Sequence, residues 1–548
     1  MSDVDVLVVG AGPTGLALAC QLARFGVRFR IIDKQPDRAG ESRALGVQAR
    51  TLEILQSFGS GELLARRGRT TTRLMLHVDR DAPVAIDLGD VGRADTRFPY
   101  ILFVSQSDTE AVLTEHLEAE GIRVERRVEL VEFRQEPAGA ICVLRDSGGH
   151  EERIRASYIA GCDGAHSTVR KGAGIPFEGG AYPQSFALGD VEADGPLVPE
   201  AINAFAVGRG VAVFFPLGQP RTWRIMAIEG GRPQSSYGSA DETVSTDHLS
   251  LADLQTMVDD PTRGTVRLRD PAWLTRFRLH HRQAARYREG RVFLAGDAAH
   301  IHSPVGAQGM NTGIQDAWNL GWKLGMVSRG LADARILDSY HAERWPVGRT
   351  LLRATDRVFG VLARSVASGG MVASLRRMMV RRVVAPALSS PRVRARAFHF
   401  VSQLGIRYRT SPVVMEGEPP LRDGPRAGDR LPDARVSGGG HITYLQQELS
   451  SPHVHLLLCG PLSAWNSDRL EQALSRFPGV LKITYLTSEE SDAALVDVHH
   501  EALSRLGVEV SAQYVIRPDG HVGFRCAGAD LDGVFAYLGR WFTADSRL

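Results

Sequence analysis

The first 33 residues constrain the fold of this chain more than any other segment. Asp5–Val9 is an apolar run of strand length, and the glycine-rich run GAGPTG follows it at residues 10–15. An Ala- and Leu-rich stretch then ends near Gly26, and a second strand is expected over Val27–Asp33. Strand, glycine turn, helix, strand and acid, in this order, form the fingerprint of a dinucleotide-binding βαβ unit. We therefore expect a Rossmann-like domain at the N-terminus, since the flanking elements make an unrelated glycine turn the weaker interpretation.

Each residue type in this fingerprint has a physical role. Gly10 permits the sharp turn, Gly12 lets a pyrophosphate approach the backbone, and Gly15 lets helix and strand pack closely. The helix that begins at Pro13 and Thr14 directs its N-terminal N–H groups at the phosphates. Asp33 would accept hydrogen bonds from an adenosine ribose, and the neighbouring Lys34 is included in the expected cofactor site.

A second expected binding edge lies within residues 291–325. The apolar run Val292–Ala295 predicts a strand buried on both faces, and Gly296-Asp297 ends it with a carboxylate at the sheet edge where ligands collect. After a loop of small residues, Thr312 and Gln315 have the spacing of a capping box. A helix start around Gly309–Thr312 offers free N–H groups and a positive dipole end. A carboxylate can bind the hydroxyls of a sugar-like chain, and a helix start can bind an anionic ring. A flavin has both parts, so this combination suits a flavin.

The segment between these two motifs predicts further elements of the same region. A helical stretch is expected over Leu45–Leu55, and an apolar strand over Tyr100–Val104 leads to Gln106. The run SDTE at 107–110 has the pattern of a second capping box, for a helix that Gly121 stops. Segments 123–134, 140–146 and 152–160 alternate as in a three-stranded antiparallel meander. The meander ends at Asp163-Gly164, for which an ordinary Asp-Gly turn is the alternative interpretation.

Residues 177–280 have the pattern of a different unit. Strand-like runs recur at 203–208, 211–217 and 222–229, with a long polar loop at 230–249. An antiparallel sheet whose apolar face carries Phe214, Phe215 and Met226 would suit one wall of a pocket for a flat substrate. The alternative is that these side chains are only core residues. Helices are expected over 339–363 and over the basic stretch 375–396.

The C-terminal part is expected to form a small α/β domain. Residues 411–440 are rich in Pro, Gly and charge and end in three glycines, which predicts a linker. Beyond it, strands and helices alternate, and Cys459-Gly-Pro-Leu462 stands at a strand-to-helix junction. This run is similar to the thioredoxin active-site turn with Leu462 in place of the second cysteine. The five cysteines show no paired spacing for a disulfide or a metal site.

Length and composition limit the number of domains and the kinds of partner. A chain of 548 residues predicts two or three domains, and 43% hydrophobic with 23% charged residues is typical of a globular protein. The formal net charge of +2 provides no strong field toward nucleic acid or membranes. Because no apolar run approaches the length of a bilayer span, we expect a cytoplasmic protein without a membrane or nucleic-acid partner.

Three motifs therefore occur in order, at Gly10–Gly15, Asp163–Arg170 and Gly296–Asn311. Together they resemble the single-component aromatic hydroxylases, flavoprotein monooxygenases of the para-hydroxybenzoate and phenol hydroxylase type. The resemblance covers essentially the whole chain and is greatest for enzymes that act on substituted phenols, such as pentachlorophenol, nitrocatechol and hydroxyphenylpropionate hydroxylases.

The resemblance implies an α/β fold in which a Rossmann-like FAD-binding domain is interleaved with an antiparallel-sheet substrate domain, followed by a thioredoxin-like domain. The expected parts are 1–176 and 281–410 for the FAD-binding domain and its helices, 177–280 for the substrate domain, 411–440 for the linker, and 441–548 for a thioredoxin-like domain without a redox cysteine pair. FAD is the implied cofactor, with NADH or NADPH and O2 as co-substrates. A homodimer is compatible with the resemblance.

The resemblance also implies roles by position. The expected cofactor-binding residues are Gly10, Gly12, Pro13, Thr14, Gly15, Asp33, Lys34, Arg43, Gln106, Asp163, Gly296, Asp297, Pro304, Gly309, Met310 and Asn311. The expected substrate contacts are Phe214, Phe215, Met226, Tyr100 and His302. The group that deprotonates the phenol is not identified, because Leu45 aligns where phenol hydroxylases carry an aspartate; Tyr100, His300 and His302 are available, and a structural role is the alternative for both histidines.

The implied reaction is hydroxylation of a substituted phenol or catechol through a flavin C4a-hydroperoxide, including displacement of a nitro or halide substituent. Hydroxylation of a polyketide or antibiotic is the alternative, because it shares every FAD motif. A third reading is an FAD reductase that does not hydroxylate.

Overall fold

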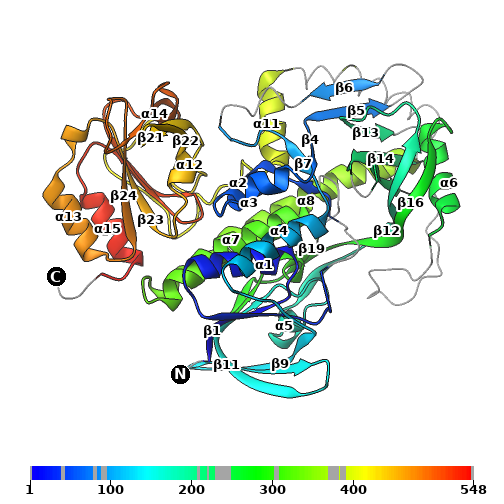
Figure 1. Cartoon of the computed structure of the whole chain (residues 1–548), viewed down its shortest axis with the longest axis horizontal. Coiled ribbons are helices and arrows are strands. Elements are labelled where there is room, and N and C mark those ends of the chain that lie inside the picture. Colours follow the sequence, from blue (N-terminus) through cyan, green and yellow to red (C-terminus); the bar gives the residue numbers. More distant parts are fainter. Residues whose placement is uncertain are drawn as a thin grey trace.

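The chain folds into three regions, which Figure 1 shows from the C-terminal domain on the left to the large antiparallel sheet on the right. The computed structural model describes residues 3–38, 44–77, 83–87, 95–205, 210–218, 221–228, 249–301, 308–367, 382 and 390–544. No helix in these ranges combines the length and apolar character needed to cross a bilayer.

The first region is built on a parallel sheet. Its central strand β1 (Val4–Val9) pairs with β2 (Phe29–Asp33) and β11 (Glu151–Gly161), and β18 (Val292–Leu294) extends it beside β11. The interior of β1 is buried because the sheet is covered by helices such as α1 (Pro13–Arg24) and α7 (Gly309–Ser328). The βαβ unit predicted from the first 33 residues is confirmed.

The predicted meander is confirmed on the same sheet. Strands β9 (Val128–Glu136), β10 (Gly139–Asp146) and β11 pair antiparallel in sequence, while β8 (Glu125–Arg126) pairs with β2. After β11, helix α5 (Thr168–Gly172) begins. The short strand β17 (Arg288–Glu289) borders β18 at the sheet edge.

Two of the predicted helix starts differ from the structure. Helix α4 (Gln106–Ala119) is capped by Ser105, whose hydroxyl accepts from the Asp108 N–H, so the capping box at Ser107 was wrong. Gln106 is consequently the first residue of α4 and not the end of a strand. The stretch Leu45–Leu55 contains the short strand β3 (Gly46–Val47) before helix α2 (Ala49–Gln56).

The rest of the segment up to residue 103 is divided between two sheets. After α3 (Ser60–Ala65), β4 (Arg69–Thr71) and β7 (Ile101–Phe103) form a small sheet with β3. Strands β5 (Arg73–His77) and β6 (Val84–Asp87) instead extend the large sheet of the second region, where β5 runs parallel to β13 (Ile202–Phe205).

The second region is the antiparallel sheet predicted for residues 177–280. Long strands β12 (Phe177–Asp194) and β16 (Arg267–Ala284) pair along their length, followed by β15 (Trp223–Ile228), β14 (Val211–Pro216) and β13. The short strand β19 (His300–Ile301) borders β16. Helix α6 (Leu251–Thr262), which we did not predict, packs on one face. The expected polar loop lies almost entirely outside the described residues.

Helices connect the second region to the C-terminal domain. The turn η1 (Gly296–Ala298) precedes α7, and η2 (Ala334–Leu337) leads into the long helix α8 (Asp338–Ala367), which contains the predicted helix 339–363. Helix α11 (Pro391–Val401) follows, and most of the basic stretch 375–396 lies outside the described residues.

The third region is an eight-stranded mixed sheet with helices against it (Figure 1). Its strands in spatial order are β20 (Met415–Glu416), β27 (Val522–Ala527), β26 (Ala512–Ile516), β23 (Val454–Cys459), β24 (Leu481–Thr487), β25 (Leu495–Val496), β21 (Arg435–Gly438) and β22 (His441–Tyr444). Its helices are α12 (Leu445–Glu448), α13 (Ser467–Arg476), α14 (Glu501–Arg505) and α15 (Asp532–Trp541), with the turn η4 (Leu462–Ala464). The segment 411–440, expected as a linker, instead supplies β20 and β21. We call residues 411–544 the C-terminal domain.

Candidate functional site

The glycine turn after β1 leaves space for a ligand at the start of α1. Gly10 has φ +100°, and a Cβ atom on it would lie 2.4 Å from the Cys162 carbonyl oxygen, while a Cβ on Gly15 would lie 1.9 Å from the Gly10 carbonyl oxygen. These contacts allow only glycine. A Cβ on Gly12, by contrast, would meet nothing within 4 Å. Because no side chain caps α1, the N–H groups of Gly12 and Thr14, on either side of Pro13, can donate to an anion such as a pyrophosphate.

Asp33 lies at the end of β2, next to this turn. Its Oδ2 accepts from the Ala11 N–H at 2.7 Å, and its Oδ1 accepts from the Gln35 N–H at 2.8 Å. The carboxylate therefore ties the glycine turn to β2, and its remaining lone pairs can accept from a hydroxyl. The neighbouring Lys34 is exposed.

The turn Gly296-Asp297 lies against the same part of α1. Gly296 has φ +62°, and a Cβ on it would lie 2.5 Å from Thr14 Oγ1. The side chain of Asp297 is exposed at the end of β18, as the sequence predicts for a residue at a sheet edge. The first and third sequence motifs thus meet around Thr14.

The second motif contacts the third. The Ser167 hydroxyl donates to Asp163 Oδ1 at 2.5 Å, and the Val169 N–H donates to Oδ2 at 3.1 Å, so Asp163 fixes the start of α5. Arg170 donates to the Ala298 carbonyl at 3.1 Å. Burial raises the pKa of Asp163, although the hydrogen bond from Ser167 opposes this effect. Asp163 therefore has a structural role beside the turn at 296–298.

Helix α7 starts close to the segment that precedes α2. The start at Gly309 is confirmed, but Thr312 donates to the Gln308 carbonyl, so the predicted capping box of Thr312 and Gln315 was wrong. Asn311 accepts from the Gln48 N–H at 2.8 Å and donates to the Gly46 carbonyl at 2.7 Å. The Asn311 side chain therefore links the start of α7 to β3 and the residue after it. Gly309 and Met310 are half-buried at the helix start.

Other predicted cofactor residues are less informative. Gln106 lies half-buried in the first turn of α4 and donates to Glu110 at 2.9 Å. Arg43, Pro304 and His302 lie outside the described residues.

The predicted substrate residues do not all share one surface. Phe215 packs toward Leu45 and Phe103, with 5.7 Å between the Phe103 and Phe215 ring centres, and Met226 lies in the cluster on the same face. Phe214 points to the opposite face and is fully buried with Trp223 near α6. Because neighbouring residues of a strand face opposite sides, Phe214 and Phe215 cannot both line one pocket.

Tyr100 and His300 also lie apart from Phe215 and Met226. Tyr100 is half-buried beside Phe98, and burial together with the charge of Glu62 raises its phenol pKa. His300 is fully buried, with Nε2 2.6 Å from Asp316 Oδ2, which supports the structural alternative for this residue. Leu45 is packed in an apolar cluster and supplies no acid or base.

Sequence reasoning missed a buried ion pair on the face that carries Met226. Arg224 donates to both oxygens of Asp190 at 2.6 and 2.7 Å, and the Trp273 indole donates to the same carboxylate at 2.8 Å. Arg224 also donates to the Ala44 carbonyl at 3.2 Å, which links the sheet to the segment before β3. The available signal was an arginine inside the apolar run WRIMAI, because a buried charge requires a partner.

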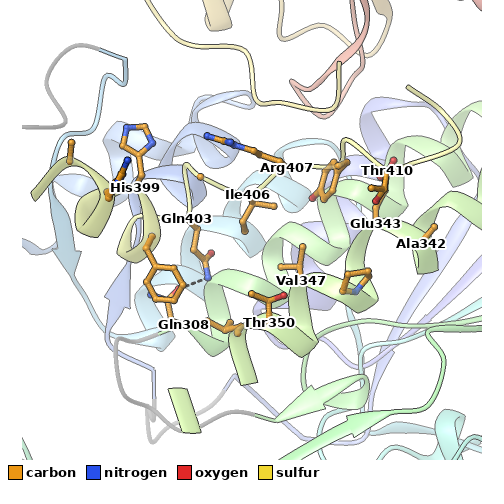
Figure 2. A pocket seen from close by; sticks show the side chains of 17 residues that line it. Gln308, Ala342, Glu343, Val347, Thr350, His399, Gln403, Ile406, Arg407 and Thr410 are labelled. Carbon is orange, nitrogen blue, oxygen red and sulfur yellow. Dashed lines mark hydrogen bonds between the residues drawn. The ribbon is translucent and has the colours of Figure 1, made fainter. Parts of the chain in front are cut away.

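A cavity of about 670 Å³ opens beside the start of α7, between α8, α11 and residues 403–410. Figure 2 shows the Gln308 and Gln403 side chains, joined by a hydrogen bond, on the side of the cavity toward α7. The apolar lining is given by Pro346, Val347, Leu351, Phe400 and Ile406. Arg396 and Arg407 add cationic groups, and His399 adds an imidazole. The Phe400 side chain is 51% exposed, so it offers an aromatic surface to a ligand.

Comparison with known proteins agrees with this geometry. A family model described as "FAD binding domain" matches residues 3–355. The chain is 34% identical to 6-methylpretetramide 4-monooxygenase of Streptomyces rimosus over 94% of this chain and 90% of that protein. It is 32% identical to pentachlorophenol 4-monooxygenase of Sphingobium chlorophenolicum over 80% of this chain and 77% of that protein. The structure of the anhydrotetracycline hydroxylase OxyS from Streptomyces rimosus aligns with a TM-score of 0.75 at 29% identity, covering 98% of this chain and 99% of that one.

The family model covers most of the chain, and the two monooxygenases named above align over 94% and 80% of its length. The chain therefore belongs to the FAD binding domain family and is one of its aromatic monooxygenases.

Proposed function

We propose that the chain hydroxylates a phenolic substrate with O2 and with NADH or NADPH as reductant. The observation that carries this proposal is the meeting of the open turn at Gly12, the exposed carboxylate of Asp297 and the start of α7 on one side of the parallel sheet. FAD, when bound, supplies the oxygen chemistry, which protein side chains alone do not provide.

Each part of the site has a proposed role in holding FAD. The N–H groups of Gly12 and Thr14 bind the pyrophosphate, and Asp33 binds the adenosine ribose. Asp297 accepts hydrogen bonds from the ribityl hydroxyls, and the N–H groups of Met310 and Asn311 face the flavin ring. Gln106, Lys34, Arg43, Asp163 and Pro304 complete the proposed set.

For the substrate, we propose a phenol that is part of a multi-ring compound, as in a polyketide. A cavity of about 670 Å³ adjoins the helix start that would face the flavin ring, and a single substituted phenol would fill only a small part of it. Volumes of this size are typical of sites for larger organic ligands. The 6-methylpretetramide relative also supports this class.

A single-ring substituted phenol or catechol is the second candidate. The similarity to pentachlorophenol 4-monooxygenase favours it, and so does the apolar face with Phe215 and Met226. Hydroxylation with release of a nitro or halide group belongs to this candidate alone.

We also propose that the C-terminal domain is a thioredoxin-like domain without redox chemistry. Cys459 is fully buried at the end of β23, where burial raises the pKa of its thiol. The residue three positions later is Leu462, so no second thiol is available in the turn.

The test is substrate-dependent oxidation of NADH or NADPH by the purified protein. We expect a flavin absorbance spectrum, faster NAD(P)H oxidation with multi-ring phenols than with single-ring phenols, and a product heavier by one oxygen atom. The opposite order of stimulation would favour the single-ring candidate. If no phenol in either set gained oxygen, the proposed hydroxylation would be wrong.

A further inference from the structure

Charged side chains are buried together where the C-terminal domain meets α7 and α8. Lys323 of α7, Glu343 of α8, and Arg517 and Asp519 of the C-terminal domain each expose 3% of their surface or less. Charges in a protein interior are costly unless they are paired and hydrogen-bonded. None of these four residues belongs to the cofactor site proposed above, and among them only Glu343 also lines the cavity proposed for the substrate. Their arrangement therefore needs a separate explanation.

The four residues form one hydrogen-bonded cluster, which we call the interdomain cluster. Arg517 donates to the two oxygens of Glu343 at 2.6 and 2.9 Å and to Asp519 at 3.1 Å. Lys323 donates to Glu343 at 2.8 Å. Both carboxylates are also reached from α7, because the Asn319 amide donates to Glu343 at 2.6 Å and to Asp519 at 3.2 Å.

The interdomain cluster continues toward the cofactor site through Tyr408 and Arg344. The guanidinium of Arg517 lies 5.5 Å from the centre of the Tyr408 ring. Arg344, the residue after Glu343 on α8, donates to the Tyr408 hydroxyl at 2.9 Å and to Asp316 at 2.6 Å. A third bond from Arg344 reaches the Thr312 carbonyl in the first turns of α7 at 3.0 Å.

Asp316 connects this chain of contacts to the turn that carries Asp297. Its Oδ2 accepts from the Gly296 N–H at 3.1 Å and lies 2.6 Å from His300 Nε2. Both ends of the segment 296–300 are therefore held by one carboxylate oxygen, while the other oxygen faces Arg344. Although burial alone would raise it, Arg344 and His300 lower the pKa of Asp316, so the carboxylate is charged.

We propose that Asp316 is a positioning residue for the Asp297 turn and that Arg517 of the C-terminal domain holds the Arg344–Asp316 pair in place. The C-terminal domain then helps to shape the cofactor site, although the side chains of Tyr408, Arg344 and Asp316 lie between Arg517 and the Asp297 turn. This inference rests on the proposed function in one respect, namely that Asp297 contacts FAD.

The chain itself offers a control for Arg517. Arg525 is also a buried arginine of the C-terminal domain, and it donates to Glu416 at 2.8 Å and to the Asp423 carbonyl at 2.6 Å. All three of these residues lie within the C-terminal domain. Arg525→Met therefore removes a buried arginine and its ion pair with the exposed Glu416 without touching α7 or α8.

The experiment compares Arg517→Met with Arg525→Met. For each variant we would measure the thermal midpoint, the Kd of the apoprotein for FAD, and the visible circular dichroism of the bound flavin. We expect both variants to lose thermal stability. Only Arg517→Met should also raise the FAD Kd, by about tenfold or about 1.4 kcal/mol, and change the flavin dichroism. If Arg517→Met is insoluble, Arg517→Lys keeps the charge but loses the bidentate geometry, and it should show the same effects more weakly.

A variant of Asp316 tests the other end of this series of contacts. Asp316→Asn keeps the shape of the side chain but weakens its pairing with Arg344, and it should raise the FAD Kd at least as much as Arg517→Met. The double variant should raise it by less than the product of the two single effects, because the residues act through one chain of contacts.

Equal FAD affinity in the Arg517→Met and Arg525→Met proteins would overturn the inference, as would fully multiplicative effects of Asp316→Asn and Arg517→Met. These outcomes are distinct from failure of the proposed function, in which the wild-type protein itself binds no FAD or hydroxylates no phenol.

Discussion

At the scale of single residues, Asp297 is the side chain on which the proposed FAD contact depends most directly. It is exposed on a turn that Asp316 holds at both ends, through the Gly296 N–H and the His300 ring, so we expect that little order has to be gained when a ligand binds. Such a carboxylate can form charge-assisted hydrogen bonds to ribityl hydroxyls, which are stronger than neutral ones.

We predict that Asp297→Ala weakens FAD binding about ten- to a hundredfold. The loss of one hydrogen bond to a charged group costs about 1.5–3 kcal/mol, and 1.4 kcal/mol corresponds to about one decade in Kd. The measurement is fluorescence titration of the apoprotein with FAD. Asp297→Asn, which keeps an acceptor oxygen, should show a smaller loss. An unchanged Kd for Asp297→Ala would show that the residue does not contact the cofactor.

Single residues differ in how far the sequence predicts them. The roles of Gly10, Gly15 and Asp297 follow from local backbone geometry, which a short motif specifies. The contacts of Asp316 and Glu343 do not, because Arg344 lies 28 residues after Asp316 and Arg517 lies 174 residues after Glu343. On a helix in isolation, such charges have the pattern of a solvated face, and only tertiary structure shows that they are buried.

At the scale of elements, the unit β1–turn–α1 determines both the packing and the ligand space of the site. Gly15, in the first turn of α1, is confined by the Gly10 carbonyl and Cys162, whereas a Cβ on Gly12 would meet nothing within 4 Å. We therefore propose that the two glycines of one motif serve different purposes, Gly15 for folding and Gly12 for binding.

We predict that Gly12→Ala and Gly15→Ala separate these two effects. Gly12→Ala should fold with a thermal midpoint close to that of the wild-type protein but bind FAD at least about tenfold more weakly, because the methyl group occupies space near the pyrophosphate. Gly15→Ala should be strongly destabilised, since its Cβ would lie 1.9 Å from a backbone oxygen. Thermal unfolding of the apoproteins, followed by FAD titration, measures both. Similar stability of the two apoproteins would contradict this division.

The elements that we predicted well are those with strong local patterns. The strands β1, β2 and β18 are apolar runs next to glycine turns, and the meander alternates clearly. Strand β5 was unassigned because its partner β13 lies more than a hundred residues away in sequence, and β6 is the edge strand that pairs with β5. The capping box at Ser107 was wrong because Ser105 and Asp108 match the same pattern, and the end of β7 at Phe103 selects the earlier residue.

At the scale of the whole molecule, one hydrophobic core joins the parallel sheet to the C-terminal domain. Leu18 and Trp322, from α1 and α7, belong to the same buried cluster as Leu456, Phe477 and Trp541 of the C-terminal domain. The interdomain cluster lies at this junction, so its protonation should affect the stability of the entire chain and not of one domain alone.

The acid stability of the protein should therefore depend on Glu343. Burial alone would raise the pKa of this carboxyl, but Arg517 and Lys323 lower it from 4.5 to about 2. Because the folded-state pKa lies below the unfolded value, Glu343 contributes its full stabilisation above about pH 4.5 and loses it as the pH falls toward 2. The carboxyls of Asp316 and Asp519 have lowered pKa values as well and add to the same trend.

We predict that Glu343→Gln flattens the dependence of the unfolding free energy on pH below 4.5. In this range the unfolding free energy of the wild-type protein should change with pH more steeply than that of the variant, by up to about 1.4 kcal/mol per pH unit, because up to one additional proton binds on unfolding. At neutral pH the variant should be less stable because Arg517 and Lys323 lose a charged partner. Urea unfolding over a series of pH values measures both effects, and Glu471→Gln, on the exposed side of α13, serves as the control that should follow the wild-type curve. Parallel curves for Glu343→Gln and the wild-type protein would mean that the interdomain cluster does not hold Glu343 in its charged form. The pH dependence of the unfolding free energy of the wild-type protein at acid pH would then have to arise from carboxylates elsewhere in the chain.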